Sequence, residues 1–317
     1  MYKTITRGKN NKFNKYELRH FLFYISLLII PIVHFFMFYL YVNVNSFVMA
    51  FQNYDLDFES GQILISFAGW DNFKIAWDSF SKYPYMLRNS LIFICIDLFV
   101  SQPLALLASY YIYKKRPGSA FFRTILYLPQ VLSSIVLGLL FKYGVQTAIP
   151  EMLYQWFGVE KMDVLLNPKT QMWVMIGFNI LMSFGVNVLL YSNAMGNVNP
   201  SLIESASLDG ANTASILWHV VLPKIYPTIV SLAIVIVSQV FVSQFQVFNI
   251  YGEGAARMGN VGYFIYLNSL NSDILGSNPN YISYPALSAF GLSLTAIIVP
   301  VTFLVKFALN RFGPRED

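Results

Sequence analysis

Six stretches of this sequence are each long and apolar enough to cross a lipid bilayer, and no other feature constrains the fold as strongly. A helix needs about 20 predominantly apolar residues to span a hydrocarbon core of about 30 Å. The stretches are 20–43, 88–113, 121–143, 171–193, 225–250 and 286–309. Charged residues make up only 12% of the chain, whereas soluble domains average about 25%. The sequence therefore predicts an all-α polytopic membrane protein with six transmembrane helices and argues against a soluble enzyme.

The distribution of Lys and Arg predicts which side of the membrane each connecting segment occupies. Segments on the side of the N-terminus hold 14 of the 21 basic residues, and an excess of basic residues marks cytoplasmic loops. The short run from Lys114 to Arg116 is the clearest marker. We therefore expect both termini in the cytoplasm and three longer outer loops, at about 44–87, 144–170 and 251–285. The net charge of +5 is assigned to this asymmetry, and no nucleic-acid partner is expected.

The chain divides into a basic cytoplasmic N-terminus (1–19), a six-helix membrane domain (20–312) and a short C-terminal tail (313–317). The first apolar stretch resembles a signal peptide but is too long and lacks a small-x-small cleavage site, so we interpret it as a retained span. In the first outer loop, Phe73, Ala76, Trp77 and Phe80 recur at helical spacing. They predict a short helix that lies either on the outer membrane interface or on the protein's own loops.

The loop between the fourth and fifth stretches, 199–223, has the signals of two short helices. Asn199 before Pro200 is typical of a helix start, which predicts a helix over 200–208. Asp209-Gly210 predicts a turn, and a second short helix is expected at about 211–219. Apolar residues are numerous here and need a cover, which could be the membrane surface, the neighbouring spans or a partner protein.

The same loop resembles the permease subunits of binding-protein-dependent ABC importers. That family carries a motif of the form E-A-A-x3-G-x9-I-x-L-P, and this chain supplies Glu204, Ala206, Gly210, Leu222 and Pro223 at the same spacing. Ser205 replaces the second alanine of the motif, and Val220 replaces its isoleucine. The run Asp209-Gly210-Ala211 is similar to the D-G-A form of carbohydrate permeases.

The likeness extends over about residues 20–312 and points to the oligosaccharide-permease branch. It includes four further segments: Phe67 to Phe73, Arg88 to Ser90, Tyr127 to Pro129 with Ser133-Ser134, and Asn310 to Phe312.

The resemblance implies a type I ABC importer permease fold in a multi-pass protein of the bacterial cell membrane. It implies uptake of a carbohydrate, foremost an oligosaccharide, delivered by an extracellular solute-binding protein. A second homologous permease would complete a heterodimer, and an ABC ATPase dimer would hold ATP and Mg, so no cofactor is expected on this chain. The residues implied in ATPase coupling are Glu204, Ala206, Asp209, Gly210, Ala211, Leu222 and Pro223.

The sequence also lacks the motif that an ATPase needs. A phosphate-binding loop has the form G-x-x-x-x-G-K-[ST], and the only Gly-Lys pair, Gly8-Lys9, is followed by Asn10. We therefore interpret the chain as a non-catalytic subunit, not itself an enzyme.

Polar side chains at helical spacing within the fourth and fifth stretches are candidates for a sugar path. The candidates are Asn179, Ser183, Asn187, Gln239, Ser243 and Gln246. Gln130, Ser133 and Ser134 are further polar groups in the third stretch. Amides and hydroxyls suit the hydroxyl groups of sugars, but the same groups also bond helices together, at about 0.6 kcal/mol each. The sequence leaves both interpretations open.

Asp97 is the only carboxylate within a predicted span. Such a group should face protein or water. It raises an alternative function, an ion-coupled secondary transporter that uses Asp97, although a structural hydrogen bond or a protonated form would explain it as well.

Overall fold

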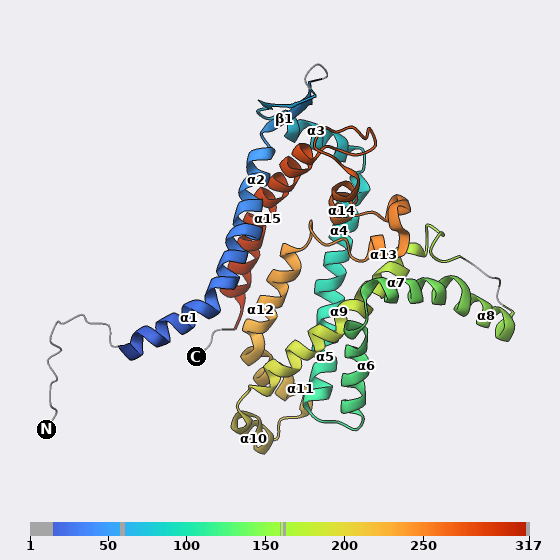
Figure 1. Cartoon of the computed structure of the whole chain (residues 1–317). Helices are drawn as coiled ribbons and strands as arrows, with labels where there is room; N and C mark the ends of the chain where they lie inside the picture. Colours follow the sequence, from blue (N-terminus) through green and yellow to red (C-terminus); the bar gives the residue numbers. More distant parts are fainter. Residues whose placement is uncertain (1–14, 58–60, 159, 161–162, 315–317) are drawn as a thin grey trace.

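The computed structural model describes residues 15–57, 61–158, 160 and 163–314, and it is built almost entirely of helices (Figure 1). Within these residues, five helices are long and apolar enough to span a membrane, and one bent pair supplies a sixth candidate. The five are Arg19–Met49, Pro84–Tyr113, Gln171–Gly196, Thr213–Ser238 and Tyr284–Phe312. The predicted all-α polytopic class is therefore confirmed. Residues 1–14 of the expected basic N-terminus and 315–317 of the expected tail lie outside the described residues.

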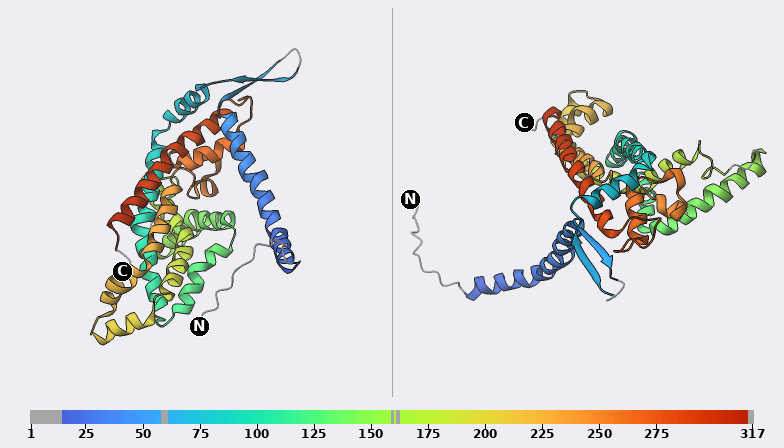
Figure 2. Two further views of the ribbon diagram at one scale, coloured as in Figure 1. Left: turned by 90° about the vertical axis from the view of Figure 1, so that its left-hand side faces the viewer. Right: turned by 90° about the horizontal axis from the view of Figure 1, so that it is seen from above.

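The first span stands apart from most of the bundle (Figures 1 and 2). It consists of α1 (Lys15–His34), the π-helical turn η1 (Phe35–Leu40) and α2 (Tyr41–Met49), and its outer part α2 packs on α15 (Tyr284–Phe312). None of the residues in its most apolar window is buried. An apolar helix with this much open surface requires lipid or a neighbouring subunit around it.

The region predicted as the first outer loop forms a hairpin and a short helix. Strands β1 (Gln52–Leu56) and β2 (Ile63–Phe67) pair antiparallel; the sequence did not predict them. Helix α3 (Asp71–Ser81) confirms the predicted short helix and buries Asn72, Ala76 and Phe80. Phe80 lies 5.0 Å from the ring of Phe290 in α15, measured between ring centroids. The helix therefore packs on the protein itself, but on the span α15 and not on loops, and its location at the membrane interface stays a prediction.

The third apolar stretch is not the single span predicted for 121–143. It forms α6 (Ser119–Val131) and α7 (Ser134–Tyr143), and the axis bends by 105° between them. Leu132 takes an extended conformation at the break. Pro129 removes one helical N–H just before the break, and serine side chains at 133 and 134 favour helix starts. After α7 the chain stays helical through η3 (Gly144–Ala148) and α8 (Ile149–Phe157).

The fifth span is shifted along the sequence from the predicted 225–250. It begins with α11 (Thr213–Ile216), continues through the π-helical turn η4 (Leu217–Val221) and ends with α12 (Leu222–Ser238). The expected separate helix at 211–219 is thus the start of this span. The π-helical turn directly precedes Pro223, whose missing N–H would interrupt regular α-helical bonding.

Residues 239–246 are consequently not helical, and the next helix is α13 (Val247–Tyr251). Phe245 and Gln246 have positive φ angles of 47° and 62°. The expectation that Gln239, Ser243 and Gln246 share one helical face is therefore wrong.

Two further regions complete the bundle. The predicted third outer loop forms η5 (Gly252–Gly254), η6 (Ala256–Met258) and α14 (Val261–Asn271). Of these, η6 packs against α4 (Pro84–Ile96), and α14 packs against both α4 and α15. Next to them, η2 (Asp97–Ser101) and α5 (Gln102–Tyr113) continue α4, and both α5 and α6 pack on α9 (Gln171–Gly196). Gly185 permits the α6–α9 contact, since a Cβ atom there would lie 2.0 Å from the carbonyl oxygen of Leu126.

Replacing Gly185 should therefore loosen the contact between α6 and α9. Gly185→Ala forces backbone apart in a packed core, a change that costs about 1–3 kcal/mol. We expect a lower thermal midpoint for the purified protein in detergent. Gly177→Ala, in the same helix with no atom within 4 Å of its added Cβ, is the control. Equal midpoints for the two variants would contradict this packing.

Candidate functional site

The segment that follows α9 begins with a capped helix, as the sequence predicts. Helix α10 spans Pro200–Leu208, with Asn199 at its N-cap. The Asn199 Oδ1 atom accepts a hydrogen bond from the backbone N–H of Ser201 at 3.1 Å. Pro200 occupies the first turn, where no N–H partner is needed. The helix projects from one end of the bundle (Figure 1).

The turn after α10 explains the spacing between Ala206 and Gly210. Gly210 has a positive φ of 83°, and its N–H donates to the carbonyl of Ser207 at 3.1 Å. The N–H of Ala211 donates to the carbonyl of Ala206 at 2.9 Å. These two bonds form a Schellman motif, which places glycine at the left-handed position. The motif residues therefore fix a reversal of the chain.

Beyond the turn the chain enters the fifth span directly. The Asn212 Oδ1 atom caps α11 by accepting from the N–H of Ser215 at 2.8 Å. Tyr110 of α5 donates from its hydroxyl to the carbonyl of Thr213 at 2.8 Å. The start of the span is thus hydrogen-bonded to α5, while α10 is not part of the span.

Burial divides the apolar residues of this segment into two sets. Ile216 and Leu217 are buried, and the half-buried Ile203 packs with them. Leu208 is 88% exposed and Leu202 is 42% exposed. The neighbouring helices therefore cover only one side of α10. Glu204 is exposed one helical turn before Leu208, and Asp209 and Gly210 are exposed directly after it, so an exposed leucine with acidic neighbours lies at the end of the helix.

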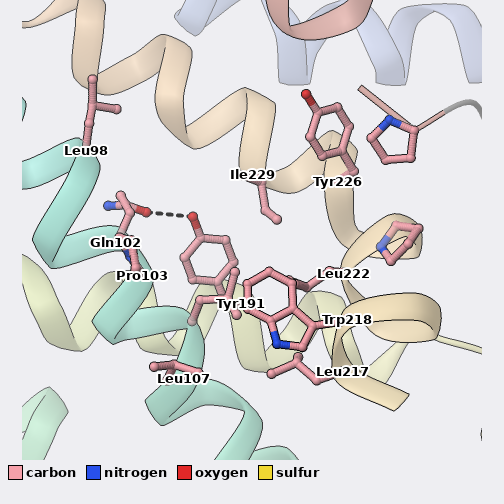
Figure 3. A pocket seen from close by; sticks show the side chains of 13 residues that line it. Leu98, Gln102, Pro103, Leu107, Tyr191, Leu217, Trp218, Leu222, Tyr226 and Ile229 are labelled. Carbon is pink, nitrogen blue, oxygen red and sulfur yellow. Dashed lines mark hydrogen bonds between the residues drawn. The ribbon is translucent and has the colours of Figure 1, made fainter. Parts of the chain in front are cut away.

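Leu222 and Pro223 occupy a different place from the exposed side of α10. They line an apolar cavity of about 660 Å³, together with Leu217 and Trp218 (Figure 3). The far wall contains Tyr191, whose hydroxyl donates to Gln102 Oε1 at 2.7 Å (Figure 3). These two motif residues shape the contact of the fifth span with α5 and α9.

A second cavity, of about 340 Å³, is polar and forms where the helices break. Its lining comes from both sides of the α6–α7 break, from α9 and from the end of the unwound segment. The lining residues are Pro129, Gln130, Leu132, Ser134, Asn179, Met182, Ser183 and Gln246. Three of the six predicted path residues therefore meet there, and two polar residues of the third stretch join them.

The other predicted path residues do not line this cavity. Asn187 is half-buried in α9 and Gln239 is exposed. Ser243 serves the local backbone: its Oγ atom accepts from the N–H of Phe245 at 3.2 Å, and its carbonyl accepts from Asn260 Nδ2 at 2.8 Å. Their roles in transport stay predictions.

Several lining residues also hold helices together, so the two interpretations of these polar groups overlap. The Gln130 amide donates to the carbonyl of Met182, which ties α6 to α9. Ser183 Oγ lies 3.5 Å from Ser101 Oγ, and the Asn249 amide donates to Gln246 Oε1. The cavity is therefore built by side chains that are themselves fixed by neighbours.

Asp97 lies behind this cavity and is buried. It hydrogen-bonds with the side chain of Ser101, while its Oδ1 atom has no hydrogen-bond partner in the part of the chain that the structure describes. The same residues contain no group of three or more His, Cys, Asp or Glu side chains placed to hold a metal ion.

Comparison with known proteins gives relatives along nearly the whole chain. A permease protein of the polygalacturonan/rhamnogalacturonan transport system of Bacillus subtilis (strain 168), YteP, is 28% identical over 306 residues, covering 92% of this chain and 88% of the relative. The arabinooligosaccharides transport system permease AraP of Halalkalibacterium halodurans is 25% identical, covering 91% and 89%.

Solved structures show the same fold. The chain matches a chain of a bacterial ABC transporter involved in the import of the acidic polysaccharide alginate, with a TM-score of 0.74 and 22% identity over 94% of this chain and 98% of that chain. A second structure, of an alginate ABC transporter in complex with a periplasmic protein bound to alginate pentasaccharide, matches with a TM-score of 0.71, 21% identity and coverage of 95% and 96%. The type I importer permease fold expected from the motif is thus confirmed.

The family assignment rests on the second to sixth spans. Residues 101–317 match the family described as the binding-protein-dependent transport system inner membrane component. This region contains the loop whose motif first indicated the resemblance. The chain is therefore a multi-pass bacterial membrane protein that belongs to the binding-protein-dependent transport system inner membrane component family.

Proposed function

We propose that this chain is the transmembrane permease subunit of an ATP-driven importer for a carbohydrate, foremost an oligosaccharide. The observation that carries the proposal is the exposed side of α10, where Leu208 is 88% exposed at the end of a fixed turn. The names of the relatives, which refer to polygalacturonan and arabinooligosaccharides, support the substrate class. ATP hydrolysis is assigned to a separate ATPase dimer, which would hold ATP and Mg and grip α10.

One continuous helix connects the coupling segment to the polar cavity. The span from Thr213 to Ser238 contains 26 residues, which corresponds to about 39 Å at 1.5 Å per residue. Its cytoplasmic end follows the Schellman turn, and its other end leads into residues 239–246, which include the lining residue Gln246. A displacement of α10 by the ATPase is thereby transmitted to the cavity wall.

Two further partners complete the proposed transporter. A second, homologous permease in a heterodimer supplies the opposite wall of the path, and an extracellular solute-binding protein delivers the sugar to the outer loops. The complex of the alginate transporter with a periplasmic protein supports this arrangement. Family membership decides against the ion-coupled secondary transporter that Asp97 suggested.

The exposed side of α10 is tested by Leu208→Asp. A charge in the centre of an apolar contact should remove at least about 1–2 kcal/mol of binding, so we expect the ATPase to be lost during co-purification and uptake to fall by about ten-fold. Leu166→Asp, at an outer leucine that is 70% exposed, is the control. Retention of the ATPase by Leu208→Asp would contradict docking at this surface.

The turn itself is tested by two substitutions of Gly210. Gly210→Val places a β-branched residue in the left-handed region at a cost of roughly 1–3 kcal/mol, whereas asparagine tolerates that region. We expect Gly210→Val to abolish sugar-stimulated ATPase activity and Gly210→Asn to keep most of it. Similar activity in both variants would show that the left-handed turn is not needed for coupling.

The polar cavity is tested by a matched pair on α9. Asn179→Leu removes a lining amide, and we expect uptake to fall by about ten-fold, since losing a hydrogen bond in a water-poor site costs about 1–3 kcal/mol. Asn193→Leu makes the same change on the same helix, at an exposed side chain outside the cavity, and should transport normally. Complex assembly, followed by size-exclusion chromatography, should be unchanged in both. Equal uptake by the two variants would show that the cavity is not part of the sugar path.

A further inference from the structure

We infer that the polar cavity selects uncharged glycans and disfavours acidic ones such as uronates. This inference rests on the proposed function, because it names the substrate class of the same site. The relatives do not indicate whether the glycan is acidic or uncharged. The one named for polygalacturonan is 28% identical, and the one named for arabinooligosaccharides is 25% identical. The decision has to come from the residues that form the cavity.

The lining offers hydrogen bonds but no charge. Its polar members are Gln130, Ser134, Asn179, Ser183 and Gln246. Amides and hydroxyls both donate and accept hydrogen bonds, which matches a sugar hydroxyl, itself donor and acceptor. A carboxylate only accepts, so it would leave the acceptor oxygens of these groups unused and would lack a counter-ion.

The segments that carry the lining place every basic side chain at a distance. Neither α9 nor residues 239–251 contain a charged residue. On α6, Arg123 precedes Gln130 by seven residues, about 10 Å along a helix, and its side chain is exposed. On α7, Lys142 follows Ser134 by eight residues, about 12 Å along a helix. Arg123 and Lys142 are not among the residues that line the cavity.

The N-terminus of α7 is an electropositive feature at the cavity, because Ser134 of its first turn is among the lining residues. Ser133 precedes it without a side-chain cap, and a helix N-terminus carries roughly half an elementary charge. That partial charge does not balance a full carboxylate removed from water, which needs a paired and hydrogen-bonded partner to be tolerated. The uncapped N–H groups serve equally as donors to the oxygen of a neutral hydroxyl.

The first ionisable group behind the wall is an acid. Ser183 of the lining lies 3.5 Å from Ser101, between their Oγ atoms, and Ser101 hydrogen-bonds with Asp97. An ionised Asp97 would repel an anionic glycan, and a protonated Asp97 is neutral and supplies no counter-charge. This chain's side of the path therefore offers no counter-charge to a uronate, either from the lining of the cavity or from the side chains behind it.

The test measures binding of two probes to the assembled transporter in detergent, with the solute-binding protein omitted. The probes are a linear arabinopentaose and a pentagalacturonate, each titrated at low and high salt. We expect arabinopentaose to bind at least ten-fold more tightly than pentagalacturonate, with no salt dependence. Equal or tighter binding of pentagalacturonate, or binding of neither probe, would overturn the inference.

A charge placed in the cavity gives a second measurement. Asn179→Arg should raise the affinity for pentagalacturonate at least ten-fold, in a manner that high salt reverses, and should weaken arabinopentaose. Asn193→Arg, at an exposed position of α9 outside the cavity, should change neither affinity. If Asn179→Arg leaves pentagalacturonate binding unchanged in a folded complex, the inference fails. If that variant does not assemble, the comparison of the two probes on the native complex decides.

A separate assay tests the proposed function itself. Glycan-loaded solute-binding protein is added to the reconstituted transporter, and ATP hydrolysis and uptake are followed. Uptake of the acidic glycan would leave the importer function intact and overturn only the selectivity. Absence of any stimulation, with either glycan, would overturn the importer function itself.

Discussion

Backbone hydrogen bonding inside a lipid bilayer is the constraint on which this structure depends. Lipid offers no partner to a free N–H or carbonyl group, so irregular backbone is tolerated only where protein or a water-filled cavity covers it. The chain leaves helical structure at two places within its predicted spans, at Leu132-Ser133 and at residues 239–246. Both departures are covered by other helices of the same chain.

At each of the two non-helical segments, specific contacts from other helices cover the backbone. The carbonyl of Ser243 receives the Asn260 amide at 2.8 Å, and α14 approaches so closely that a Cβ atom on Gly262 would lie 2.2 Å from that carbonyl oxygen. At the other break, Gly185 lets α6 lie directly on α9, and the Gln130 amide reaches the carbonyl of Met182. The polar cavity is lined from both breaks, by Gln130, Leu132 and Ser134 at one and by Gln246 at the other.

Sequence reasoning succeeded where a local rule fixes the structure. Asn199, Pro200 and Gly210 predicted the limits of α10, since capping and positive φ are decided by a few neighbouring residues. Length and hydropathy predicted the all-α polytopic class, because the apolar length of a helix decides whether it can span a membrane. The spacing of Phe73, Ala76 and Phe80 likewise predicted α3, but not which surface it would cover, since that depends on Phe290 more than 200 residues away.

The errors in the predicted third and fifth spans have a shared physical origin. Hydropathy measures transfer from water to lipid and carries no information on direction, so the 105° bend inside 121–143 left no signal in composition. Pro223 suggested a helix boundary, yet the π-helical turn over Leu217–Val221 leads straight into α12. Moving the helix start to Thr213 also moved its end to Ser238, and the polar residues beyond it lost their helical register.

The shifted fifth helix connects the coupling segment to the polar cavity in the proposed mechanism. Had the fifth helix begun at 225, the coupling segment would have been connected to the membrane through a flexible joint, and much of its movement would have been lost there. Instead, the Asn212 cap starts a helix that runs without interruption to Ser238, and the bond from Tyr110 to Thr213 fixes its start against α5. The helix is continuous between the Schellman turn at one end and residues 239–246 at the other. A force applied to α10 is therefore converted at the far end, beside Gln246, where a small change of backbone would open or close the polar cavity.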